Sequence, residues 1–345
     1  MTGAPSGMEG ATAVEFFRRM NAQQVEYALL RNYEQYPSFG HDIDLILRWN
    51  DLPKWKAVAK SCAEDFGWSA LTECDHWARS SCREHTIQIL RFYATSPLRY
   101  LQIDAFHAMP VNGLPLFDED ALLCGRISDD RGFFRIDERM ENFFRLFQIS
   151  SLAGVAGAEE KLELYRERAL SFWSAAGDLD HYSASAGFSG MEAAVEHLRA
   201  GDLRSFRLKI DRQKRAWWRS RMFSHPWRGS TLILNRFADY MRLFWLRPCG
   251  FTVRVSAPAR QHGMVDAIMR RLVGANLIRG YTVAGSMKRR QQVMERGGIA
   301  VEWASAERAD VILDGDADEE RVSARLVTLI LERHPRILDR RQAAS

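Results

Sequence analysis

The sequence predicts a mixed α/β fold in three sections. Short apolar runs that alternate with polar residues recur between residues 25 and 106, which is typical of half-buried strands. Helical spacing of apolar residues dominates the middle of the chain, and strand-like and helix-like segments alternate again near its end. We therefore expect an α+β section at 1–136, a helical section at 137–246 and a small parallel α/β section at 247–345.

The first section is expected to open with an amphipathic helix around residues 14–20. After it, the spacing predicts a strand at 25–31, an apolar strand within 40–47, a helix at 52–66, and strands at 86–93 and 100–106. These elements alternate between strand and helix closely enough to form one sheet with helices packed against it.

Two aspartates, one residue apart, interrupt the apolar run at 40–47. In a strand, residues i and i+2 point to the same face, so Asp42 and Asp44 would project side by side while Ile43 and Leu45 contribute to the core. Adjacent carboxylates repel each other and raise each other's pKa unless a cation lies between them. Mg²⁺ or Mn²⁺ would suit such oxygen ligands. The alternative is a solvated strand end that carries two acids.

A third acid, Asp104, lies alone in the apolar strand at 100–106. A buried aspartate needs a partner or a metal, so bringing Asp104 beside the first pair is the economical explanation. Two acids on one strand and a third on a neighbouring strand can hold two metal ions about 4 Å apart.

Three segments carry a family resemblance: Leu29-Leu30-Arg31-Asn32-Tyr33-Glu34, Gly40-His41-Asp42-Ile43-Asp44-Leu45 and Leu101-Gln102-Ile103-Asp104. They resemble the nucleotidyltransferase superfamily related to DNA polymerase β, and most closely its small bacterial members, over roughly residues 10–170. The resemblance implies a Mg²⁺- or Mn²⁺-dependent transferase that moves a nucleotidyl group from a nucleoside triphosphate to a hydroxyl. The acceptor would be a small molecule such as a sugar, a glycan intermediate or a protein side chain rather than a nucleic-acid end.

The same resemblance assigns roles to individual residues. Asp42, Asp44 and Asp104 would be the catalytic metal ligands, and Arg31, Gly40 and His41 would lie near the nucleotide. Lys161, in the helical section, would reach the nucleotide phosphates, although an ordinary exposed helix face is the alternative for it. The family's Gly-Ser pair ahead of the aspartates is less obvious here, where Ser38-Phe39-Gly40 lies almost on top of the acids.

The middle section is expected to consist of helices. The spacing predicts helices at 139–152, 158–176, 191–200, 203–220 and 232–245, with breaks at Gly177, 187–190, Gly201 and 226–229. Nine basic residues lie between Arg204 and Arg228, with Asp211 as the only acid, and Trp217, Trp218, Phe223 and Trp227 lie among them. This segment could bind an anionic surface or a phosphorylated carrier. The alternative, which we favour from the helical spacing, is a structural helix whose tryptophans are buried between the first and third sections.

The third section resembles the first strand and helix of P-loop nucleoside-monophosphate kinases at 247–253 and 265–268. In place of that family's phosphate-binding loop the chain has Ser256-Ala257-Pro258-Ala259-Arg260-Gln261-His262-Gly263-Met264. The family's glycines are absent, and His262 and Gly263 stand where the family has its lysine and hydroxyl. We therefore expect a degenerate P-loop-like section that does not bind ATP at this loop, with His262 as a loop residue.

Composition restricts the class of protein. The chain has 345 residues, of which 46% are hydrophobic and 27% charged, and it contains no run of about 18 apolar residues. Its five cysteines are scattered and fit reduced thiols, and its net charge of +4 does not by itself indicate a nucleic-acid partner. We expect a cytoplasmic protein. A non-catalytic scaffold derived from nucleotide-handling domains and a polyanion-binding module centred on 204–228 are the alternatives to an enzyme.

Overall fold

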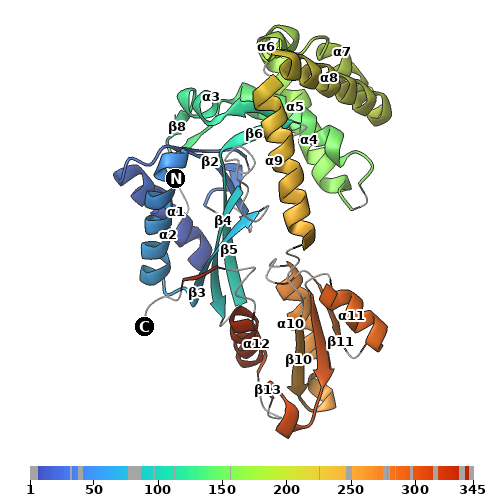
Figure 1. Ribbon diagram of the computed structural model, residues 1–345. Helices are drawn as coiled ribbons and strands as arrows, with labels where there is room; N and C mark the ends of the chain where they lie inside the picture. Colours follow the sequence, from blue (N-terminus) through green and yellow to red (C-terminus); the bar gives the residue numbers. More distant parts are fainter. Residues whose placement is uncertain are drawn as a thin grey trace.

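The computed structural model in Figure 1 shows a mixed α/β protein. The residues that it describes are 7–31, 33–37, 42–76, 87–95, 98–111, 114–155, 157–224, 226–245, 251–274, 278, 280–283, 285–295, 298–313, 318–333 and 339–341.

The first section is built on an eight-stranded sheet with the order β14-β3-β4-β5-β2-β1-β9-β8. Its strands are β1 (Tyr27–Leu29), β2 (Asp42–Leu47), β3 (Ala70–His76), β4 (Ile87–Thr95), β5 (Leu98–Phe106), β8 (Ile127–Asp129), β9 (Phe133–Arg135) and β14 (Asp339–Arg341). β2 and β5 are parallel neighbours at its centre, whereas β4 runs antiparallel to β5 and β1 runs antiparallel to β2.

One face of this sheet is covered by two helices, α1 (Gly7–Ala22) and α2 (Leu52–Asp65), which lie together in Figure 1. Phe16 and Phe17 of α1 and Trp55 of α2 form a single buried core with the side chains of β2 and β5. Ile43 and Leu45 belong to that core, so the alternation of the strand directs Asp42 and Asp44 to the opposite face.

The helical section comprises α4 (Glu138–Leu152), α5 (Glu159–Ala176), α6 (Leu179–Ser185), α7 (Glu192–Arg199), α8 (Leu203–Ser224) and α9 (Pro226–Trp245). Its core also takes in the hairpin of β6 (Ala108–Val111) and β7 (Leu114–Asp118), while α3 (Glu119–Cys124) packs against the sheet. The expected break at 226–229 is present but lies just before these residues, since α8 ends at Ser224 and α9 begins at Pro226. Proline is accepted as the first residue of a helix, and α9 begins at Pro226 and continues through Gly229.

The third section is a four-stranded parallel sheet with the order β11-β12-β10-β13. Its elements are β10 (Phe251–Ser256), α10 (His262–Gly274), β11 (Tyr281–Val283), α11 (Met287–Glu295), β12 (Ile299–Trp303), β13 (Val311–Ile312) and α12 (Glu319–Arg333). The expected parallel α/β arrangement is therefore present. Within the described ranges, no helix is long and apolar enough to cross a membrane.

The chain returns from the third section to the first. β14 pairs with β3 at the edge of the large sheet, and the side chain of Tyr93 on β4 is buried in the core of the third section. Both contacts cross the boundary that we expected at residue 247. They could not be predicted, because they depend on three late residues and on one aromatic side chain rather than on a periodic pattern.

Candidate functional site

The three predicted acids lie on one face of the central strands. Asp44 on β2 pairs in register with Asp104 on β5, and Asp42 pairs with Gln102. Paired residues on neighbouring strands have Cα atoms about 5 Å apart, so the Cα atoms of Asp42 and Asp104 lie about 8 Å apart on the diagonal. The structure thus brings together the acids that the sequence singled out.

The environments of the three carboxyl groups differ. The Asp44 side chain is buried, with 4% of the residue exposed, whereas Asp42 is exposed and Asp104 is partly buried. Burial, together with the charges of Asp44 and Asp42, raises the pKa of Asp104 to about 7, although hydrogen bonding to Gln102 opposes the shift. The Oδ1 atom of Asp104 is buried without a hydrogen-bond partner in the described part of the chain. Such an oxygen is stabilised by a proton or by a cation.

Arg31 contacts the acids directly. Its Nε donates to Oδ2 of Asp44 at 2.6 Å, and its Nη1 donates to the hydroxyl of Tyr165 at 3.4 Å. Burial lowers the pKa of Arg31, but the charge and hydrogen bond of Asp44 outweigh it, so that the pKa is raised. Arg31, which the family resemblance placed near the nucleotide, therefore lies beside the acids and joins them to α5.

Positive charge gathers around Tyr165. Lys161, one turn earlier on α5, has its Nζ 5.6 Å from the centre of the Tyr165 ring, and the guanidinium of Arg145 on α4 lies 5.7 Å from it. Lys161 and Arg31 thus both lie near Tyr165, but Lys161 is exposed, which also fits the ordinary helix face given as its alternative, so its contact with phosphates remains a prediction. Arg166, the next residue after Tyr165, instead donates to the carbonyl of Leu198 and pairs with Glu163.

The segment after β1 is also held by the helical section. The hydroxyl of Tyr33 donates to Oε2 of Glu141 on α4 at 2.6 Å, and Arg168 on α5 pairs with Glu34 at 2.7 Å. Gly40 and His41, predicted to lie near the nucleotide, are outside the described residues, and so is the segment Ser38-Phe39-Gly40.

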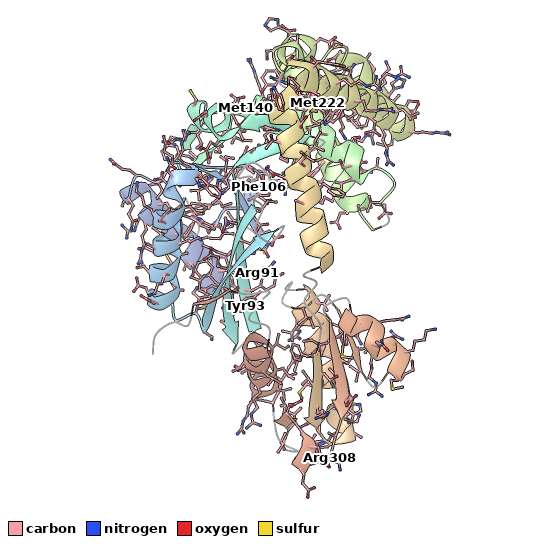
Figure 2. The ribbon with its side chains drawn as sticks, viewed as in Figure 1. Arg91, Tyr93, Phe106, Met140, Met222 and Arg308 are labelled. Carbon is pink, nitrogen blue, oxygen red and sulfur yellow. The ribbon has the colours of Figure 1, made fainter. Side chains whose placement is uncertain are left out.

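The face of the sheet that carries Asp42, Asp44 and Asp104, here called the acidic face, also carries two polar residues that were not among the predicted site residues. Arg91 on β4 is buried and its Nε donates to Oε1 of Gln102 at 2.7 Å; Gln102 is in turn the register partner of Asp42. Figure 2 shows Phe106, Arg91 and Tyr93 one below another along the strands of this face. The signal was available: Gln102 is two residues from Asp104, and Arg91 lies in a strand that was predicted.

The donor set is chemically suited to Mg²⁺ or Mn²⁺, since it consists of carboxylate oxygens, one of them without a partner. As the side chains are placed, however, no group of three or more His, Cys, Asp or Glu residues among those described is arranged to hold a metal ion. One oxygen of Asp44 is engaged by Arg31. Metal binding by Asp42, Asp44 and Asp104 therefore remains a prediction, in which Asp44 would contribute Oδ1, the oxygen that the Arg31 contact does not use.

A hollow of about 510 Å³ lies elsewhere in the first section. Asn21, Glu26, Arg126, Phe133 and Phe134 are among the residues that line it. None of the acidic-face residues contributes to its lining, so it is separate from the candidate site.

The segment 256–264, which stands where the related kinases have their P-loop, joins β10 to α10. β10 ends at Ser256, and His262 is the first residue of α10, so it is helical and not the loop residue that we expected. Its ring stacks on Trp303, with centroids 3.6 Å apart and planes 6° apart. That ATP does not bind at 256–264 remains a prediction.

The basic segment at 204–228 lies mostly on α8. Trp217 is buried, but within the core of the helical section and stacked on Phe188, not between the first and third sections as expected. Trp218 is partly buried in the same core. The location that we favoured for the tryptophans is therefore wrong, because the helices α4 to α7 provide an apolar core of their own.

Comparison of the chain with known protein families, with curated proteins and with solved structures gives no match.

Proposed function

We propose that the protein is a metal-dependent nucleotidyltransferase whose active site is the acidic face of β2 and β5. The observation that carries the proposal is the register of two parallel strands, which sets Asp44 opposite Asp104 with Asp42 on the same face. Close carboxylates repel each other, and Arg31 pairs with Asp44 but leaves Oδ1 of Asp104 buried without a partner, which favours a role in binding a further cation.

Asp42, Asp44 and Asp104 would hold the metal. Bound there, Mg²⁺ supplies charge neutralisation on the triphosphate and on the entering and leaving oxygens. The residues of the chain do the rest. Arg31 and Lys161 lie on the side of the site next to α5, where their cations suit the binding of phosphate oxygens.

The reaction balances as a single displacement. The acceptor hydroxyl oxygen forms a bond to the α-phosphorus, the bond from that phosphorus to the bridging oxygen breaks, and pyrophosphate leaves. Asp104 accepts the hydroxyl proton, since it is the acid with an unpartnered buried oxygen on this face.

The test is incubation of the purified protein with each labelled nucleoside triphosphate and Mg²⁺ or Mn²⁺, with and without a cell extract as a source of acceptor. We expect label transfer that falls by about 100-fold or more in Asp42→Asn and in Asp104→Asn, because each removes a metal ligand. Asp130→Asn is the matched control, since Asp130 is exposed in the turn between β8 and β9.

Equal transfer by wild type and Asp42→Asn would overturn the assignment. An absence of transfer with every nucleotide, both metals and the extract, from protein that is folded by circular dichroism, would favour the non-catalytic scaffold instead.

A further inference from the structure

The α8–α9 corner has a composition and exposure that the proposed catalytic reaction does not explain. α8 carries eight basic residues and one acid, Asp211. One face of the helix is buried in the helical core through Phe206, Ile210 and Trp217. The exposed face therefore carries most of the charge.

That exposed face is a regular stripe. Arg212, Arg215 and Arg219 recur at i, i+3 and i+7, so they lie on one side of α8 and all three are exposed. The acid, Asp211, pairs with Arg207 at 3.8 Å and with Lys214 at 3.5 Å. In the part of the chain that the structure describes, no ion pair joins the three stripe arginines to an acid.

Large apolar side chains are exposed where the stripe ends. Phe223, one turn after Arg219, is 85% exposed, and Trp227, in the first turn of α9, is 88% exposed. Met222 points the other way: a Cβ at Gly229 would collide with its sulfur, so the two helices pack closely there. Figure 2 shows Met222 at this corner.

The apolar surface continues along α9. Leu234 is 67% exposed and Phe237 is 63% exposed. With Trp227 they fall at i, i+7 and i+10, which places them on one face of the helix over about 15 Å. Figure 1 shows α9 as a long helix that leaves the helical section and runs toward the third section. Several large exposed apolar side chains on one side of a helix are typical of an interaction site.

We propose that the α8–α9 corner docks on an anionic lipid bilayer, with the arginine stripe against the headgroups and Phe223, Trp227, Leu234 and Phe237 at the boundary of the acyl chains. A bilayer surface supplies both complements at once: negative charge, and an apolar layer in which Trp, Phe and Leu are the usual anchors. Docking of this kind needs no spanning helix.

Charge and chemistry disfavour the other occupants. A second copy that paired through this corner would bring two strongly basic helices together, which is repulsive. A nucleic acid would use the arginines and could stack on the aromatic rings, but it gives no reason for Leu234 to be exposed beside them.

The experiment is sedimentation of the full-length protein with phosphatidylcholine vesicles, with and without phosphatidylglycerol, at low and at physiological salt. We expect binding only to the anionic vesicles. The triple variant Arg212→Gln, Arg215→Gln, Arg219→Gln should bind about 100-fold less at low salt, because each basic residue contributes near the surface. The double variant Phe223→Ser, Trp227→Ser should lose about 10-fold or more at either salt concentration.

Matched controls lie in the third section. Arg289→Gln, Arg308→Gln, Arg321→Gln removes three exposed arginines, and Met287→Ser, Ile312→Ser removes two exposed apolar side chains. Figure 2 shows Arg308 at the far tip of that section. Both variants should bind vesicles as the wild type does.

A second measurement tests the depth of Trp227. Lipids with brominated acyl chains should quench the tryptophan fluorescence of the wild type more than that of Trp227→Phe.

Three results would overturn the proposal. The first is vesicle binding that the apolar double variant leaves unchanged, which would indicate attraction to any polyanion. The second is tighter binding to polyuridylate RNA than to anionic vesicles. The third is a concentration-dependent dimer that the double variant abolishes while vesicles do not bind. Unchanged thermal melting of each variant would show that the fold is retained.

Discussion

Asp104 is the residue at which burial and like charge act together. Its folded pKa is about 7, whereas the ordinary value is 3.8. The folded chain therefore holds the proton more tightly than the unfolded chain does, so stability falls as pH rises from about 3.8 to about 7. We expect Asp104→Asn to unfold at higher denaturant concentration than the wild type in the presence of a chelator. The gain should be largest above about pH 7, where it reaches about 2–4 kcal/mol.

Denaturant titration at about pH 5 and about pH 8 measures this gain, because the two values lie on either side of the expected titration. Asp130→Asn should show the same stability relative to the wild type at both, since Asp130 is exposed. A gain for Asp104→Asn that did not grow with pH would contradict the electrostatic account of the site.

At the same scale, the three acids could be predicted from the sequence, whereas Arg31 as the ion-pair partner of Asp44 could not. Alternation alone puts Asp42 and Asp44 on one face, and an isolated acid in an apolar strand singles out Asp104. The ion pair between Arg31 and Asp44 depends on how β1 and β2 pair, and pairing is a three-dimensional property that local patterns do not encode.

At the scale of elements, α4 and α5 are tied to the acidic face by a buried polar network. It runs from Tyr33 through Glu141, Arg145 and Tyr165 to Arg31. Tyr165→Phe keeps the ring and removes only the hydroxyl that accepts from Arg31. We expect this variant to raise the KM for the nucleoside triphosphate about 10-fold, since Arg31 loses one of its two anchors, and to change stability by no more than about 1 kcal/mol.

Steady-state kinetics with the nucleotide as the varied substrate tests this positioning role. The matched control is Tyr281→Phe, which removes a hydroxyl that donates to Asp266 at 2.8 Å in the third section. It should leave KM unchanged. Wild-type kinetics in Tyr165→Phe would show that Arg31 does not depend on α5 for its position.

The elements that the sequence predicted best are those with a long apolar period. The helices at 139–152 and 158–176 appear with a shift of one residue at their first ends, whereas the short helix α6 and the short strands β8 and β9 were missed. Such elements hold too few residues to show a period, and β14 exists only because β3 offers it an edge.

At the scale of the whole molecule, the first and third sections share a buried residue. Tyr93 belongs to β4 of the large sheet, yet its side chain packs in a core with Val253, Ile268 and Leu326 of the third section. α12 contacts β4 and β5 as well, and Tyr100 packs against the same core. The third section is therefore docked on the acidic side of the sheet, beyond Arg91, and its unfolding should be coupled to that of the first section.

We expect Tyr93→Ser to uncouple the two sections. Removal of a buried ring costs about 3–5 kcal/mol, and here the loss falls on the contact between two cores, so the third section should unfold at a lower temperature than the first. Scanning calorimetry should show a shared transition in the wild type and a separated, earlier one in the variant. Ile268→Val, within the core of the third section alone, should lower the free energy of unfolding by about 1 kcal/mol and leave a single, shared transition. An unsplit, unshifted transition in Tyr93→Ser would mean that the third section holds its place through α12 and β14 without this side chain.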